Sequence, residues 1–273
     1  MSLLRRHLAP ISAAAWEVID DQARKVLKLA LAARKMVDFN GPRGLGKSAV
    51  GLGRIQKLGK EPAPGVTAAL RRVQPLVELH ARFEIQRTEI DAIERGADDP
   101  DLKAIDEAAQ RIARAEDGAV FNGYEAAGIE GIIPASVHPS LTISDRYEDY
   151  PRLVAEATRL LRVAGVAGPY GIALGPRCYA GLMQATEHGY PVLELVRRVT
   201  DGPLVWAPAV DGAVVLSTRG GDYELTVGQD LSIGYDSHDE NVVRLFLFES
   251  FTFRVLSPEA GVALRYAKSP SKS

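Results

Sequence analysis

The stretch that decides the fold is residues 219–253, RGGDYELTVGQDLSIGYDSHDENVVRLFLFESFTF, where β-rich segments alternate with polar turns. Tyr223–Val227 and Val242–Phe253 are rich in β-branched and aromatic residues, which favour strands. The pair Gly220-Gly221 predicts a turn between Tyr223–Val227 and a preceding strand at 213–217. The C-terminal part of the chain is therefore predicted to be mainly β-structure.

Upstream of this stretch, helical and strand patterns alternate. Amphipathic spacing predicts helices over residues 12–36, 101–121, 151–164 and 191–199. Further strands are predicted at 75–83, 171–174, 204–206, 213–217 and 262–266. Interleaved helices and strands followed by a run of strands predict an α+β fold.

The first helix carries more apolar surface than one core requires. Ser12 is its predicted N-cap. One stripe, with Arg34 near its centre, consists of Trp16, Ile19, Ala23, Val26, Leu27, Ala30 and Leu31. Val18 and Leu29 form a second, smaller apolar patch. Two interpretations explain the two apolar patches. Both patches pack against the protein's own core, or one of them is a face that binds a partner.

Residues 40–66 are rich in glycine and proline, which disfavours a buried element. Val50, Leu52, Ile55 and Leu58 nevertheless have the spacing of a weak ribbon. Long segments of this kind are often ordered by a neighbour. We expect an arm that rests on another subunit.

The composition excludes several classes of protein. A formal net charge of -2 argues against a nucleic-acid partner, since phosphate binding requires a basic excess. Cys178 is the only cysteine, which rules out an intrachain disulfide and fits a reducing compartment. Neither a signal peptide nor a membrane-spanning apolar run is visible. We expect a cytoplasmic protein with no membrane partner.

Residues 41–48, GPRGLGKS, match the phosphate-binding P-loop pattern G-x-x-x-x-G-K-S. A functional P-loop needs a buried strand before it and a helix directly after it. The preceding segment, 34–40, is charged and short, and Gly51 and Gly53 disfavour a helix after the motif. We interpret the match as accidental, with a P-loop nucleotide-binding enzyme as the alternative.

No other pattern assembles an active site. The five histidines are scattered without metal-ligand spacing. Cys178 is interpreted as a small core residue, although Arg177 beside it could lower the pKa of a thiol. The protein is therefore predicted not to be an enzyme and to hold no metal.

Several stretches resemble the encapsulin shell family, formerly described as linocin-like bacteriocins. The resemblance runs from about residue 3 to residue 266. It is carried by Leu8-Ala9-Pro10-Ile11, Trp16 with Ile19-Asp20, residues 33–38 with Gly41-Pro42, Glu94-Arg95-Gly96, Glu116-Asp117 with residues 121–123, residues 168–170, residues 187–191 and, above all, residues 219–223, 228–235 and 244–253.

The resemblance implies the fold of the HK97 bacteriophage capsid protein. By that likeness we assign 1–41 to the N-terminal helix and the start of a peripheral domain. We assign 42–70 to an extended loop, 71–126 to the peripheral domain with a spine helix at 101–123, and 127–218 to an axial domain. Residues 219–266 complete the peripheral domain, and 267–273 form a disordered tail.

The resemblance also implies a function. Family members form icosahedral shells, and we expect a T=1 shell with on the order of 60 subunits. The cargo would be a dye-decolorising peroxidase or a ferritin-like ferroxidase, serving oxidative-stress defence or iron storage. Its C-terminal targeting peptide would bind inside the shell. A prophage capsid protein of the same fold is the rival interpretation.

The family likeness also assigns site residues. The cargo-peptide groove would be bordered by Leu27, Leu31, Arg34, Asp38, Ile233 and Tyr235. The fivefold pore would be ringed by Glu187, His188, Gly189 and Tyr190. Some relatives hold a flavin against a tryptophan at the position of Thr88, so we expect no flavin and no other cofactor.

Overall fold

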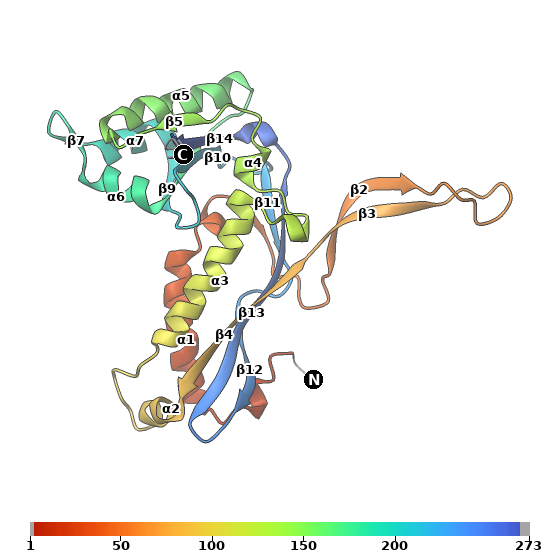
Figure 1. Ribbon diagram of the computed structural model, residues 1–273, viewed down its shortest axis with the longest axis vertical. Helices are drawn as coiled ribbons and strands as arrows, with labels where there is room; N and C mark the ends of the chain where they lie inside the picture. Colours follow the sequence, from red (N-terminus) through yellow and green to blue (C-terminus); the bar gives the residue numbers. More distant parts are fainter. Residues whose placement is uncertain (1–2, 268–273) are drawn as a thin grey trace, which may run out of the picture.

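Strand β13 (Val242–Val255) is the axis of the molecule and runs through both of its halves (Figure 1). The computed structural model describes residues 3–267. One edge of β13 pairs with β4 (Val77–Gln86), and the other pairs first with β12 (Ser232–His238) and then with β11 (Tyr223–Val227). The short β1 (Asp38–Asn40) extends this sheet beyond β11 in parallel.

The second sheet lies in the upper half of the molecule (Figure 1). Its strands, in spatial order, are β5 (Leu141–Ile143), β14 (Gly261–Tyr266), β10 (Ala213–Ser217), β6 (Tyr170–Leu174) and β9 (Asp201–Trp206). Helices α5 (Tyr150–Val163), α6 (Pro176–Gln184) and α7 (Val192–Thr200) accompany it. All five residues of β6 and of β10 are buried, as expected for strands in the middle of a sheet.

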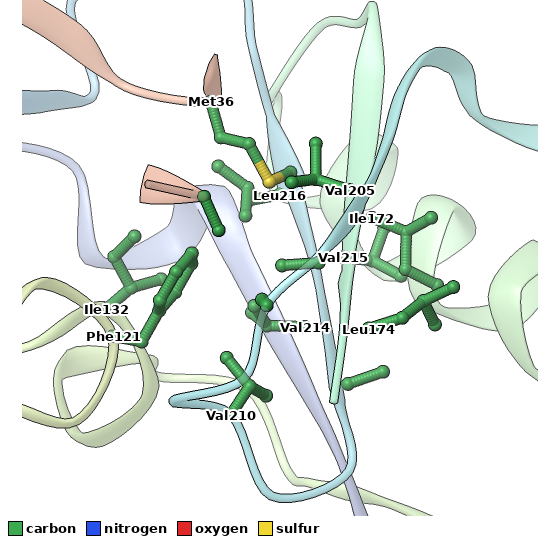
Figure 2. Packing of buried hydrophobic residues seen from close by; sticks show 14 of the residues in the cluster. Met36, Phe121, Ile132, Ile172, Leu174, Val205, Val210, Val214, Val215 and Leu216 are labelled. Atoms are coloured by element: carbon green, nitrogen blue, oxygen red, sulfur yellow. The ribbon is translucent and has the colours of Figure 1, made fainter. Parts of the chain in front are cut away.

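Each half has its own hydrophobic core. The upper core packs side chains from β6, β9 and β10 against Met36, Phe121 and Ile132, as Figure 2 shows. The lower core lies between β4, β12 and β13 on one side and three helices on the other. These helices are α1 (Ala13–Ala30), α2 (Arg87–Glu94) and the long α3 (Lys103–Asn122). β13 contributes to both, because Leu245 is in the lower core and Phe253 in the upper one.

The other elements are short. They are η1 (Arg6–Leu8), η2 (Ala33–Lys35), η3 (Glu125–Ala127), α4 (Ile132–Ala135), η4 (Tyr147–Asp149), the hairpin strands β7 (Thr186–Glu187) and β8 (Tyr190–Pro191), and η5 (Pro258–Ala260).

The two-stranded arm of β2 (Ala49–Lys57) and β3 (Ala69–Pro75) projects away from both halves (Figure 1). No residue of 49–75 belongs to either core. The amide N of Leu76 donates to the carbonyl oxygen of Ser48 over 2.9 Å, so the two ends of the arm are adjacent. The predicted ribbon is present, but it continues to Pro75, five residues beyond the predicted end of the extended loop.

The predicted α+β class and most of the predicted elements are confirmed. The first helix, however, ends at Ala30 and not at residue 36. The buried carboxylate of Asp117 accepts the amide N–H groups of Ala32 and Ala33, both over 2.9 Å, and holds the chain out of the helix. Ser12 is the N-cap, as predicted, because its Oγ accepts from the amide N of Ala15.

Two connections link the two sheets of the molecule. Gly220-Gly221 does form a turn, but the strands on its two sides, β10 and β11, belong to different sheets. Residues 261–266 form β14, which pairs with β10 and β5 in the upper sheet, and their assignment to the peripheral domain stays a prediction. The length of β13 explains this pairing, since its fourteen residues deliver the chain into the upper half.

Two expectations concern other parts of the chain. The predicted disordered tail falls almost entirely on residues 268–273, which lie outside the described residues. Over residues 3–267, no helix combines the length and the apolar character needed to cross a bilayer.

Candidate functional site

A groove with a volume of about 510 Å³ lies beside the lower core, between α1, the N-terminal segment and the edge strand β12. Its apolar lining consists of Leu4, Ala23, Leu27, Leu31, Leu231, Ile233 and Leu247. Its polar lining consists of Arg6, Asp20, Arg24, Lys28, Arg34, Asp230 and Ser232. Apolar walls with a few charged groups are typical of a peptide-binding groove.

Four of the six predicted groove residues line this cavity, namely Leu27, Leu31, Arg34 and Ile233. Asp38 does not. Its Oδ2 accepts the amide N–H of Gly221 over 2.6 Å, so its carboxylate serves to hold the turn that leads into β11. Asp38 lines a separate, smaller cavity of about 140 Å³.

Tyr235 also lies outside the groove lining. Its side chain is buried, and its hydroxyl lies 2.5 Å from Nδ1 of His238. The main chain of Tyr235 instead holds the N-terminal segment, because its amide N donates to the carbonyl oxygen of Leu4 over 2.8 Å. Of the six predicted border residues, Asp38 and Tyr235 do not line this cavity with their side chains, and their part in binding a peptide stays a prediction.

One end of the groove is built on a buried charge cluster around Arg34. Its guanidinium bonds to Asp230 over 2.7 Å, to Glu249 over 3.0 Å and, through Nε, to Glu116 over 2.9 Å. Glu116 and Glu249 are completely buried. Three carboxyl groups therefore bond to a single guanidinium, and a fourth, that of Asp117, belongs to the residue next to Glu116. Because the carboxyl groups outnumber the guanidinium, ionising all of them at once in this buried site is energetically unfavourable.

Burial raises the pKa values of two carboxyl groups in the cluster. Burial, followed by the neighbouring Glu116, raises the pKa of Glu249 well above its usual value. Burial raises the pKa of Asp117 to about 7, although the amide N–H groups of Ala33 and Ala32 oppose the shift. Both shifts favour the protonated forms of these two carboxyl groups.

The raised pKa of Glu249 predicts how the free energy of unfolding depends on pH. A carboxyl group with a raised pKa in the folded state stabilises the fold below its unfolded pKa of about 4.3, and this stabilisation is lost as the pH rises through the folded pKa. Glu249→Gln keeps a neutral side chain that can still accept from Arg34. We expect the variant to be more stable than wild type near pH 9 but not near pH 5. Urea unfolding at both pH values measures this, and parallel pH profiles would contradict it.

A partial signal for this cluster is present in the amino-acid sequence. Arg34 lies on the apolar stripe predicted for the first helix, and Glu116-Asp117 lie inside the otherwise apolar face of α3. Opposite charges placed among core positions indicate a buried pair. Leu4, Arg6, Asp20 and Leu247 were missed, because nothing in their local spacing shows that they meet.

The P-loop-like segment lacks the context of a phosphate site, and several of its main-chain donors are already used. The motif, residues 41–48, is preceded by the three-residue β1 and followed by the strand β2, where a P-loop needs a helix. The amide N of Arg43 donates to the carbonyl oxygens of Val227 and Gly228, and that of Gly44 donates to Gly228 over 2.7 Å. These main-chain groups anchor the base of the arm, so the interpretation of an accidental match is supported.

Residues 187–190, predicted to ring a pore, form the tip of the β7–β8 hairpin, at the end of the upper half that lies farthest from the arm (Figure 1). His188 (φ 49°) and Gly189 (φ 80°) both have positive φ, as a two-residue type I′ turn requires. The guanidinium of Arg198 lies 5.2 Å from the ring centroid of Tyr190 and donates to its hydroxyl over 2.8 Å. The hairpin therefore has a defined shape, and its role in a pore remains a prediction.

Three further predictions concern the cysteine, flavin binding and metal binding. Cys178 is completely buried, as predicted, and burial raises the pKa of its thiol. Thr88 lies exposed in the first turn of α2, and the expected absence of flavin stays a prediction. Among residues 3–267, no three His, Cys, Asp or Glu side chains are grouped as a metal site.

Comparisons with known proteins match this architecture. The family model Linocin_M18, described as "Encapsulating protein for peroxidase", matches residues 1–252. The type 1 encapsulin shell protein of Rhodospirillum rubrum is 52% identical over 271 residues, which cover 97% of each chain.

Two solved structures have the same fold. The virus-like particle from Pyrococcus furiosus superposes with a TM-score of 0.63 at 20% identity, covering 92% of this chain and 99% of that one. The capsid of Myoviridae phage XM1 gives a TM-score of 0.55 at 11% identity, covering 86% and 91%. These likenesses show the α+β fold of HK97-type capsid proteins. With the family model matching most of its length and a relative 52% identical, the chain belongs to the family of encapsulin shell proteins.

Proposed function

We propose that the chain is the subunit of a closed icosahedral shell that encloses another protein in the cytoplasm. The smallest such shell, T=1 with on the order of 60 subunits, is the assembly we expect. The cargo we expect is a dye-decolorising peroxidase or a ferritin-like ferroxidase, for oxidative-stress defence or iron storage. The family described as encapsulating a peroxidase, and the shell protein of R. rubrum, support the proposal.

The observation that carries the proposal is the unpartnered arm. Ile55, Leu70 and Val73 are 62%, 56% and 51% exposed, although they lie in paired strands. An isolated two-stranded ribbon is at best marginally stable in water. A second copy of the chain would cover these side chains. A head-to-tail contact of this kind produces a closed particle when the rotation that relates neighbouring subunits belongs to a closed point group.

Charge supports a second copy as the partner of the arm. Residues 49–75 contain five of the 33 basic side chains and one of the 35 acidic ones. The arm therefore carries a net charge of +4, and the rest of the chain, with 28 basic and 34 acidic side chains, carries −6. Arms repel each other and are attracted to the body of a neighbour, which favours the head-to-tail arrangement.

The assembly is tested by the mass of the purified protein. We expect a megadalton particle in native mass spectrometry and hollow spheres in negative-stain micrographs. A monomer of 29.5 kDa as the only species would reject the shell proposal.

The groove beside α1 is the site we propose for the C-terminal peptide of the cargo. A short peptide in an open groove binds weakly, but many grooves facing one oligomeric cargo raise the apparent affinity by about 10²–10⁴. The hairpin of residues 187–190 would then line the entry route for small ions and peroxide, as the family likeness implies.

Truncation of the groove floor should reduce loading. We expect Leu27→Ala to reduce encapsulation several-fold, because Leu27 is part of the apolar lining. Leu29→Ala, two residues further along α1, is the matched control, since Leu29 is 73% exposed and does not line the groove. The measurement is fluorescence per purified particle after co-expression with a fluorescent protein that carries the cargo's C-terminal peptide. Equal loading of both variants would remove the groove from the proposal.

A further inference from the structure

The groove runs along an open strand edge. β12 is the last strand on its side of the sheet, so only one of its edges is paired, with β13. Ser232 and Ile233 of β12 line the groove. An open edge presents main-chain N–H and C=O groups that can pair with another extended chain.

The protein's own N-terminal segment already uses this edge at one point. The amide N of Tyr235 donates to the carbonyl oxygen of Leu4 over 2.8 Å, so the main chain of Tyr235 faces away from β13. Main-chain groups alternate in direction along an antiparallel strand. Pairing with β13 is regular from Ser232 to Tyr235, because the irregularity lies between Tyr235 and Ser237. Ile233, two residues before Tyr235, therefore directs its N–H and C=O to the open side.

These groups of Ile233 are available. Within residues 3–267, no hydrogen bond outside the sheet is formed by the amide N or the carbonyl oxygen of Ile233. Beside them lies the apolar floor formed by Leu27, Leu31 and Leu247. A strand placed there would satisfy the free main-chain groups of Ile233 and direct every second side chain onto this floor.

The two ends of the groove limit such a strand. Arg6 and Asp20 form an ion pair of 2.7 Å, and both line the groove next to Leu4. The guanidinium of Arg6 also lies 3.9 Å from the ring centroid of Trp16, which fixes the N-terminal segment in place. At the other end, Arg34 pairs with Asp230 over 2.7 Å. β14, the last strand of the described residues, belongs to the other sheet and does not occupy this edge (Figure 1).

We propose that the guest peptide binds by β-strand addition to the open edge of β12. The N–H and C=O of Ile233 form its main-chain hydrogen bonds, and Leu4 blocks the next position and so sets its register. The occupant is an extended peptide with apolar side chains at alternate positions. This inference rests on the proposed cargo groove and specifies how the groove holds its guest.

A proline scan of the guest tests the pairing without changing the shell. The probe is a fluorescent protein fused to the C-terminal peptide of the cargo and co-expressed with the shell, with an alanine scan as the control. Proline lacks the amide N–H. At every second position of the peptide, we therefore expect the proline variant to be retained by the shell about tenfold less than the alanine variant at the same position. A loss that follows side-chain size alone would overturn the inference.

A matched pair of shell variants tests the same bond from the other side. Ile233→Pro removes the outward N–H, which the ladder with β13 does not use, and edge strands tolerate proline at such positions. Ile233→Ala removes more of the side chain but keeps the N–H. We expect Ile233→Pro to load about tenfold less than Ile233→Ala. Equal loading of the two variants would contradict strand addition.

The outcomes separate this inference from the proposed function. If wild-type shells do not retain the unmodified fusion, the cargo groove itself is wrong. If they retain it but the scan shows no alternation, only strand addition is wrong. If Ile233→Pro fails to form particles, the proline scan still decides, because it uses the wild-type shell.

Discussion

Replacing residues 49–75 by two glycines is expected to give a folded subunit that no longer forms shells. The fold should survive because the arm contributes to neither core and because Ser48 and Leu76 are already hydrogen-bonded to each other, so a short linker can close the gap. Assembly should fail because the exposed apolar side chains and the five cations of the arm are removed together. Size-exclusion chromatography with light scattering and far-UV circular dichroism measure the two effects separately.

Two point substitutions control for the possibility that the deletion disturbs the rest of the subunit. Ile55→Asp and Val73→Asp place charges on exposed apolar positions of the arm and leave its length unchanged. Each should lower the yield of particles strongly and leave the melting of the subunit's secondary structure unchanged. Full-sized shells from the deletion, or normal yields from both substitutions, would show that the arm is not an assembly contact.

Arg34→Met is expected to be the most destabilising single substitution in the lower half. The variant leaves Glu116 and Glu249, both fully buried, without their only cation. Removing one partner of a buried ion pair typically costs about 3–5 kcal/mol. The loss should be smaller at pH 5 than at pH 8, because protonation then neutralises the carboxyl groups left behind. The midpoint of urea unfolding, followed by tryptophan fluorescence at fixed subunit concentration, measures it.

Arg159→Met is the matched control for Arg34→Met. Arg159 pairs with Glu156 over 2.7 Å, but both side chains are exposed on α5. Exposed ion pairs contribute little to stability, so the unfolding midpoint should hardly change. If the two variants lose the same stability, or if Arg34→Met is stable at pH 8, the cluster does not depend on its buried cation.

Much of the fold could be predicted because it depends on local patterns. The N-cap at Ser12 and the strands Ala213–Ser217 and Tyr223–Val227 follow from residue type and spacing, and the structure has them at these positions. β12 was missed as a strand, since Gly234, Asp236 and the polar residues that follow interrupt its apolar alternation. Its place at the edge of the sheet, with β13 as its only partner there, tolerates such a sequence.

The candidate site was predicted only in part. Leu27 and Leu31 could be placed on one face of a helix, and the family likeness supplied Ile233. The likeness also supplied Asp38 and Tyr235, whose side chains are used elsewhere, by the turn at Gly221 and by His238. Whether a side chain faces a groove depends on which elements it meets.

The sequence by itself determined the α+β class, most helices and strands, the family, and an arm unable to fold into a core. Short-range periodicity and backbone preference suffice for the first two, because they act between neighbours in the chain. Only the tertiary structure decided that Arg34, Glu116, Asp230 and Glu249 meet, that β14 joins the upper sheet, and that the open edge of β12 borders the groove. Those contacts join residues up to 215 positions apart, and their energies arise from burial, which no local pattern encodes.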